Sequence, residues 1–139
     1  KNAPTIYGYG TGTEQFEALK NFSNHMMYYD KPLVMLDTVT DINLMSLRMN
    51  PGDAFIITSL SGNTPMIDEI VEILKLKGIS IISITNNTKN AIASCADISL
   101  YFQDDTYHGL KSLHWTAITL RVLLDQILHH YIATLYPER

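Results

Sequence analysis

The chain has 139 residues, 46% of them hydrophobic, and carries 10 basic against 14 acidic side chains, for a formal net charge of −4. This length and apolar content predict one globular domain, residues 1–139, and exclude disorder as a description of the whole chain. The acidic balance argues against direct binding of nucleic acid, and no apolar window approaches the roughly 20 residues of a membrane-spanning helix.

Short apolar runs alternate with longer segments of helical periodicity, which predicts an α/β fold: a three-layer α/β/α sandwich with a five-stranded parallel sheet. The predicted strands are Thr5–Tyr9, Leu33–Leu36, Ala54–Ser59, Ile79–Thr85 and Ile98–Phe102. The predicted helices are Glu14–Tyr28, Val39–Met49, Met66–Lys77 and Leu110–Leu135, with about one helical turn at Ala91–Cys95.

The third predicted strand, Ala54–Ser59, is uninterrupted and rich in β-branched residues, as is typical of a central strand buried on both faces. In parallel sheets of this kind a ligand binds beyond the carboxyl ends of the strands, at the point where the strand order reverses. The loops after the first, third and fourth strands are therefore the candidate binding loops.

The loop after the third strand has the composition of a phosphate cradle. Ser59, Ser61 and Thr64 carry hydroxyl donors, Gly62 lets the backbone approach a ligand closely, and a helix N-terminus follows. Free N–H groups and the helix dipole favour a phosphate there without Lys or Arg. Plain helix capping is the alternative, because Ser, Asn and Thr followed by Pro65 also begin a helix without any ligand.

These residues resemble the SIS (sugar isomerase) domain family, whose hallmark is Ser-x-Ser-Gly-x-Thr after a hydrophobic strand. Ser59, Ser61, Gly62 and Thr64 match this motif. The later family motifs Ile-Thr-Asn and Ala-Asp are matched in the same order by Ile84-Thr85-Asn86 and Ala96-Asp97. The resemblance runs from Ile6 to about Tyr131 and implies the flavodoxin-like SIS fold.

The resemblance also implies which residues bind a ligand. In the family, the serines, the threonine and nearby amides hold the phosphate of a phosphosugar, and the loops after the first and fourth strands flank the sugar. The implied site residues are Gly10, Thr11, Thr13, Ser59, Ser61, Gly62, Asn63, Thr64, Thr85 and Asn86. Family members usually have Gly-x-Gly-x-Ser in the first loop, whereas Gly12 occupies the serine position here. No cofactor is expected, and the histidine spacing predicts no metal site.

A dinucleotide site is a competing interpretation of the first loop. Gly8, Gly10 and Gly12 follow a strand and precede a helix, and Asp37 ends the second strand, where an acidic residue would bind a ribose hydroxyl. The third glycine falls one position earlier than in the Gly-x-Gly-x-x-Gly pattern. The serine-rich loop after the third strand also argues against a dinucleotide.

An isomerase on this fold needs a base that moves a proton between carbons, which in the family is usually a glutamate helped by a histidine. No glutamate lies between Glu72 and Glu138, so Asp104 or Asp105 would have to replace it, with His108 as the best catalytic candidate. A sugar-phosphate isomerase therefore stays the alternative. We expect no catalytic residue and no enzyme activity.

The expected function is that of the effector domain of an RpiR-type transcriptional regulator of carbohydrate metabolism, in which a phosphosugar changes the affinity for DNA. The chain begins at Lys1 without Met, almost inside the first strand, so we expect a fragment that lacks an N-terminal helix-turn-helix domain. Cys95 is the only cysteine and no secretory signal is visible, which favours the cytoplasm.

The last predicted helix, Leu110–Leu135, is apolar nearly all round and therefore needs burial on more than one side. Packing against the sheet is one explanation for these apolar faces. The other is the seam of a homodimer, which fits the family's habit of dimerising. Both explanations stay open at the level of sequence.

Overall fold

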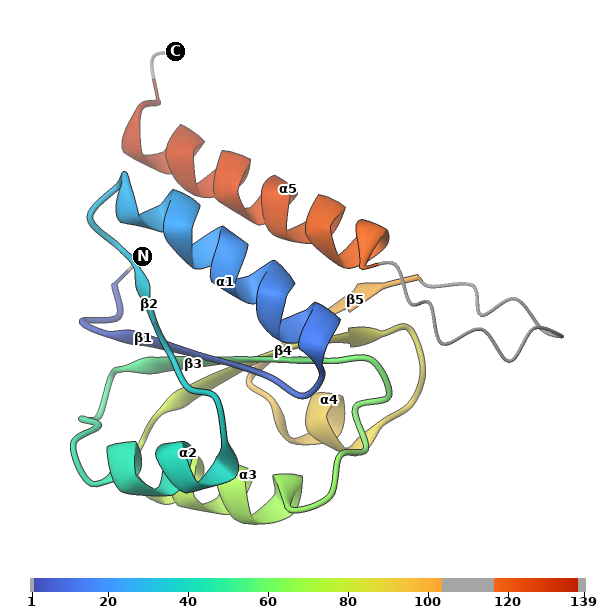
Figure 1. Ribbon diagram of the computed structural model, residues 1–139. Helices are drawn as coiled ribbons and strands as arrows, with labels where there is room; N and C mark the ends of the chain where they lie inside the picture. The colour runs from blue at the N-terminus through green and yellow to red at the C-terminus, as the bar shows by residue number, and fades with distance from the viewer. Residues whose placement is uncertain (1, 104–116, 138–139) are drawn as a thin grey trace, which may run out of the picture.

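The chain forms a five-stranded parallel sheet with helices on both faces, in a computed structural model that describes residues 2–103 and 117–137 (Figure 1). The strands are β1 (Ile6–Gly10), β2 (Leu33–Met35), β3 (Ala54–Ser59), β4 (Ser80–Asn86) and β5 (Ile98–Phe102). The helices are α1 (Thr13–Met27), α2 (Val39–Ser46), α3 (Ile67–Leu76), α4 (Ala91–Cys95) and α5 (Ile118–Leu135). The predicted three-layer α/β/α sandwich is confirmed.

The predicted elements are all present, and most of their ends move by only a few residues. The prediction for α2 was wrong at its end, because the helix ends at Ser46 rather than Met49. The N–H groups of Leu47 and Arg48 donate to carbonyls only three residues earlier, so a tight turn replaces the last helical residues. Residues 110–116 of the last predicted helix lie outside the described part of the chain.

The order of the strands in the sheet is β2-β1-β3-β4-β5, and every neighbouring pair is parallel. From β1 the chain moves outward to β2, and from β3 it moves outward in the opposite direction to β4 and β5. The switch point therefore lies between β1 and β3, where the loops that leave the two strands diverge to opposite faces of the sheet.

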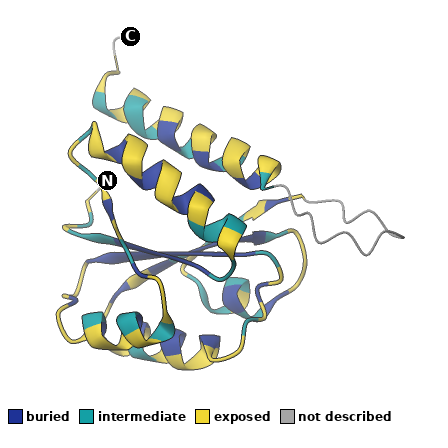
Figure 2. Ribbon diagram, in the orientation of Figure 1, coloured by how far each residue is buried: buried dark blue, intermediate teal, exposed yellow. Residues whose placement is uncertain are grey.

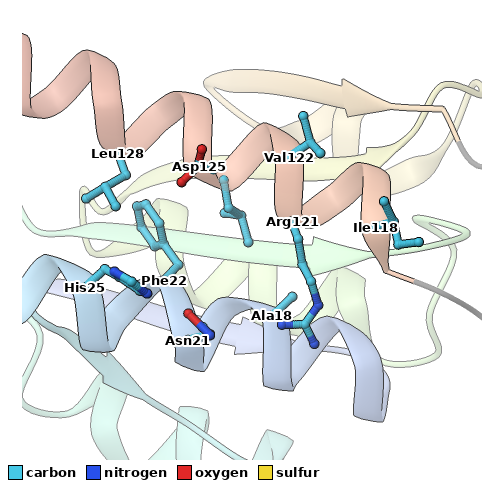
Figure 3. A pocket seen from close by; sticks show the side chains of 10 residues that line it. Ala18, Asn21, Phe22, His25, Ile118, Arg121, Val122, Asp125 and Leu128 are labelled. Atoms are coloured by element: carbon cyan, nitrogen blue, oxygen red, sulfur yellow. The ribbon is translucent and has the colours of Figure 1, made fainter.

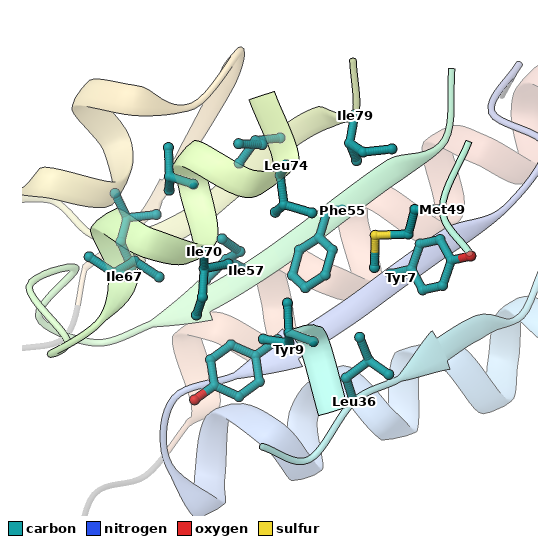
Figure 4. Packing of buried hydrophobic residues seen from close by; sticks show 14 residues of the cluster. Tyr7, Tyr9, Leu36, Met49, Phe55, Ile57, Ile67, Ile70, Leu74 and Ile79 are labelled. Atoms are coloured by element: carbon teal, nitrogen blue, oxygen red, sulfur yellow. The ribbon is translucent and has the colours of Figure 1, made fainter. Parts of the chain in front are cut away.

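The two faces of the sheet carry separate hydrophobic clusters. One packs under α2, α3 and α4 and includes Tyr7, Phe55 and Leu74 (Figure 4). The other packs under α1 and α5 and includes Leu19 and Leu124. Because β3 contributes to both clusters, it is buried along its whole length, as the sequence predicted (Figure 2).

Hydrogen-bonding side chains cap the N-termini of some helices but not of others. The Thr38 side chain accepts a hydrogen bond from the Asp41 N–H at 3.1 Å, and the Asp41 carboxylate accepts one from the Thr38 N–H at 3.0 Å, a capping box that begins α2. No side chain among the described residues caps α1 or α3. Within the same residues, no helix combines the length and the apolar content needed to cross a membrane.

The packing of α3 on the sheet predicts how substitutions in this helix change the free energy of unfolding. Leu74 is fully buried, whereas Leu76 on the same helix is 82% exposed. We expect Leu74→Ala to lower the free energy of unfolding by about 2–5 kcal/mol, because it removes buried methyl groups and leaves a cavity. The matched control Leu76→Ala should change it by less than about 0.5 kcal/mol. Urea denaturation followed by circular dichroism measures both, and equal losses would contradict the assigned packing of α3.

Candidate functional site

A cleft of about 610 Å³ lies at the switch point, between the loops that follow β1 and β3. This volume is within the range of pockets that bind small molecules. The lining residues are Thr11, Gly12, Thr13, Glu14, Gln15, Leu60, Ser61, Asn63, Thr64 and Pro65. Both α1 and α3 begin at this edge of the sheet, so their N-termini flank the cleft (Figure 1).

The loop after β3 is shaped from behind by Ser59. The Ser59 side chain is fully buried, and its hydroxyl oxygen accepts a hydrogen bond from the Gly62 N–H at 3.0 Å and lies 3.4 Å from the Thr64 hydroxyl. Gly62 has φ of +68°, a left-handed conformation that favours glycine. Met66 adopts φ of +66° just before α3, and left-handed backbone is uncommon for a residue with a side chain.

Asn90 links this loop to the loop after β4, and the sequence analysis missed it. Its side-chain amide donates to the Thr85 hydroxyl at 2.9 Å, while its carbonyl oxygen accepts from the Ala93 N–H at 2.8 Å and begins α4. A Cβ added to Gly62 would collide with this side chain. The one sequence signal for Asn90 is its place immediately before a short helix, where asparagine is a favoured cap.

Several hydrogen-bond donors stay available to a ligand. The backbone N–H groups of Ser61 and Thr64 donate to no other described residue. The Ser61 hydroxyl oxygen accepts from the Asn63 N–H at 3.1 Å, so its own proton is free to donate. Because Met66 occupies the cap position of α3 without a capping side chain, the explanation of this motif as plain helix capping is wrong. A helix N-terminus in this state attracts anions.

The structure divides the ten predicted site residues into two groups. Those that line the cleft are Thr11, Thr13, Ser61, Asn63 and Thr64. Those that lie behind it and do not line it are Gly10, Ser59, Gly62, Thr85 and Asn86. A Cβ at Gly10 would meet the backbone of Phe16, so this glycine lets α1 pack closely on β1. Thr85 is fully buried and accepts the hydrogen bond from Asn90.

Two polar residues of the lining, Glu14 and Gln15, were missed by the sequence analysis. Both belong to the first turn of α1. The Glu14 carboxylate lies 3.9 Å from the guanidinium of Arg121 on α5, and both side chains are about half exposed. An acidic residue in the first turn of a helix is common, because it interacts favourably with the helix dipole. The position of Glu14 in the sequence therefore did not indicate a binding site.

The structure argues against the dinucleotide interpretation of the first loop. Asp37 lies after β2 and lines a different hollow, together with Asp41 and Arg48, rather than the cleft at the switch point. Asp37 and the glycine loop therefore do not line one common pocket. The proposed catalytic residues of the isomerase alternative, Asp104, Asp105 and His108, lie outside the described residues.

Comparison with known proteins identifies the family. The family model of the SIS domain matches residues 1–125. The chain belongs to the SIS domain family. Within residues 2–103 and 117–137, no group of three or more His, Cys, Asp or Glu side chains is placed to hold a metal ion.

The SIS domain has relatives among regulators. It is 33% identical over 99 residues to the HTH-type transcriptional regulator GlvR of Bacillus subtilis strain 168, a match that covers 71% of this chain and 39% of GlvR. The chain thus spans about two fifths of the length of that relative. The predicted resemblance to the SIS domains of transcriptional regulators is confirmed.

Two solved structures share the fold. The sugar isomerase domain of an RpiR transcription factor from Sphaerobacter thermophilus superposes with a TM-score of 0.81 at 14% identity, covering 99% of this chain and 74% of that one. The Vibrio vulnificus NanR protein, complexed with ManNAc-6P, superposes with a TM-score of 0.79 at 18% identity, covering 99% of this chain and 51% of that one.

The contact between Gly62 and Asn90 predicts an asymmetry between two glycines. We expect Gly52→Ala to lower the free energy of unfolding by roughly 1–2 kcal/mol, because Gly52 has φ of +94° but nothing within 4 Å of an added Cβ. Gly62→Ala carries the same backbone strain and adds a collision with Asn90. We expect this collision to lower the free energy of unfolding by a further 1–3 kcal/mol, an order-of-magnitude range of about the cost of overpacking. Thermal and urea denaturation measure the difference, and equal losses would contradict the close contact between Gly62 and Asn90.

Proposed function

We propose that this SIS domain binds a phosphorylated sugar or amino sugar as the effector domain of a cytoplasmic transcriptional regulator of carbohydrate metabolism, without chemistry of its own. The observation that carries the proposal is the cleft at the switch point, lined by hydroxyl groups and free N–H groups from two loops and two helix N-termini. The identity to GlvR supports a regulator, and the NanR complex with ManNAc-6P supports a phosphosugar.

The phosphate binds at the loop after β3 in this proposal. Ser61 and Thr64 donate from their hydroxyls and from their backbone N–H groups, and the uncapped start of α3 adds the positive end of its dipole. Asn63 shapes the loop in this proposal, since its N–H donates to the Ser61 hydroxyl at 3.1 Å and its side-chain oxygen accepts from the Ala91 N–H at 3.0 Å. Ser59 and Gly62 hold the loop in shape from behind.

The sugar lies between this loop and the loop after β1. Thr11 and Thr13 line the opposite wall of the cleft, and Gly10 allows α1 to approach that wall. Thr85 and Asn86 support the site indirectly. Thr85 holds Asn90, and the Asn86 N–H donates to the Leu60 carbonyl at 3.2 Å.

In the same proposal, a helix-turn-helix domain outside this chain binds the DNA. The net charge of −4 does not suit contact with phosphate backbones. GlvR, which is described as an HTH-type regulator, is considerably longer than the stretch matched here.

We also propose that the domain forms a homodimer through the groove between α1 and α5 (Figure 3). This groove has a volume of about 400 Å³ and is mostly apolar. Ile118 and Val122 beside it are 62% and 55% exposed, while Arg121 and Asp125 offer charges of both signs. A face with apolar groups and both charges is suited to pairing with its own copy across a twofold axis.

The phosphate cradle is tested by Ser61→Ala. We expect this variant to weaken the binding of a phosphosugar by about 1.5–3 kcal/mol, the contribution of a hydrogen bond to a charged group. Ser80→Ala is the matched control, because Ser80 is exposed at the start of β4, the end of that strand away from the cleft. Isothermal titration with hexose phosphates measures both variants. Equal affinity for the phosphorylated and the unphosphorylated sugar would overturn the cradle.

The dimer face is tested by Val122→Lys. We expect this variant to be monomeric at concentrations at which the unchanged domain is dimeric, because a lysine would place a charge in the centre of an apolar contact. His130→Lys is the control, since His130 is exposed on α5 and does not line the groove. Sedimentation velocity measures the oligomeric state, and a dimeric Val122→Lys variant would rule out this face.

A further inference from the structure

Glu14 is the only charged side chain among the described residues that line the cleft. Glu14 therefore places a negative charge at the edge of the cavity that would receive a phosphate, which is itself an anion. Like charges in one site oppose binding unless the carboxylate meets hydrogen-bond donors on the same ligand. Arg121 does not remove this conflict, because the two groups are 3.9 Å apart, half exposed to water, and Arg121 lines the groove rather than the cleft.

The position of Glu14 is opposite to that of the phosphate loop. Glu14 belongs to the first turn of α1, which follows β1, whereas Ser61 and Thr64 belong to the loop that follows β3. A phosphate on the second loop thus leaves the rest of the ligand pointing across the cleft toward α1. Sugar hydroxyls and protonated sugar amines are donors, and an ionised carboxylate only accepts.

We propose that Glu14 determines specificity by accepting hydrogen bonds from the hydroxyl or ammonium groups of the sugar, so that phosphosugars are preferred over phosphate alone. This inference rests on the proposed function. The two walls of the cleft then have opposite roles. The loop after β3 attracts any phosphate, whereas Glu14 opposes an anionic ligand unless that ligand also carries hydrogen-bond donors that reach the carboxylate. Glu14 selects by charge and by hydrogen bonding together.

The test compares the affinities of three probes at about pH 7.5, namely methyl phosphate, glucose 6-phosphate and glucosamine 6-phosphate. We expect Glu14→Gln to lower the ratio of hexose phosphate affinity to methyl phosphate affinity by about fivefold, the difference between a charged and a neutral hydrogen bond. The repulsion between Glu14 and the phosphate group cancels in that ratio, because the probes carry the same phosphate monoester. A larger fall for glucosamine 6-phosphate than for glucose 6-phosphate identifies the amine as the donor, and equal falls identify hydroxyls. Glu17→Gln, an exposed neighbour on α1 outside the cleft, should leave the ratio unchanged.

Arg121→Gln separates this role from a merely structural ion pair. It breaks the same pair but leaves the Glu14 carboxylate free, so the preference for hexose phosphates should hold or rise. An equal fall in Glu14→Gln and Arg121→Gln would overturn the inference. An unchanged ratio in Glu14→Gln, with binding that still depends on Ser61, would overturn it while the proposed function stands. Absence of binding by both hexose phosphates to the unchanged domain would overturn the proposed function and the inference together.

Discussion

The burial of β3 on both faces is the constraint on which the rest of this fold depends. A strand with no exposed face needs partners on both edges and cover on both sides, and β1, β4 and helices on each face of the sheet provide them. Crossovers between parallel strands are right-handed, and the chain moves from β1 to β2 in one direction and from β3 to β4 in the other, so it leaves β1 and β3 toward opposite faces. The cleft between the two departing loops follows from this arrangement before any ligand is considered.

The polar residues at the cleft separate into a buried and an exposed set. Ser59, Thr85 and Asn90 are buried and satisfy each other or nearby backbone, so they hold the β3 loop in one conformation. Ser61 and Thr64 project from that conformation with donors still available. A loop that is already ordered loses little entropy when it binds a ligand, which favours recognition of a small anion without cations.

The sequence predicted the elements well because their signals are local: apolar runs for strands and 3.6-residue periodicity for α3. It also predicted that the loop after β3 lines a cleft, because hydroxyls and glycine follow a buried strand. It did not separate Ser59 from Ser61, since it does not show that the buried Ser59 hydroxyl accepts from the Gly62 N–H of its own loop. Asn90 and Glu14 were missed because the contacts that connect them to other segments, with Gly62 and with Arg121, come from distant parts of the chain.

Helix α1 lines both the cleft at the switch point and the groove proposed as the dimer surface. Its first turn lines the cleft through Thr13, Glu14 and Gln15, and its later turns line the groove through Phe22 and His25. Together the two sets of lining residues span about 18 Å, from Thr13 to His25, along a helix of 1.5 Å rise per residue, and no proline or glycine interrupts it. The helix is therefore stiff, so a ligand that tilted its first turn in the cleft would also move the proposed dimer surface at its other end.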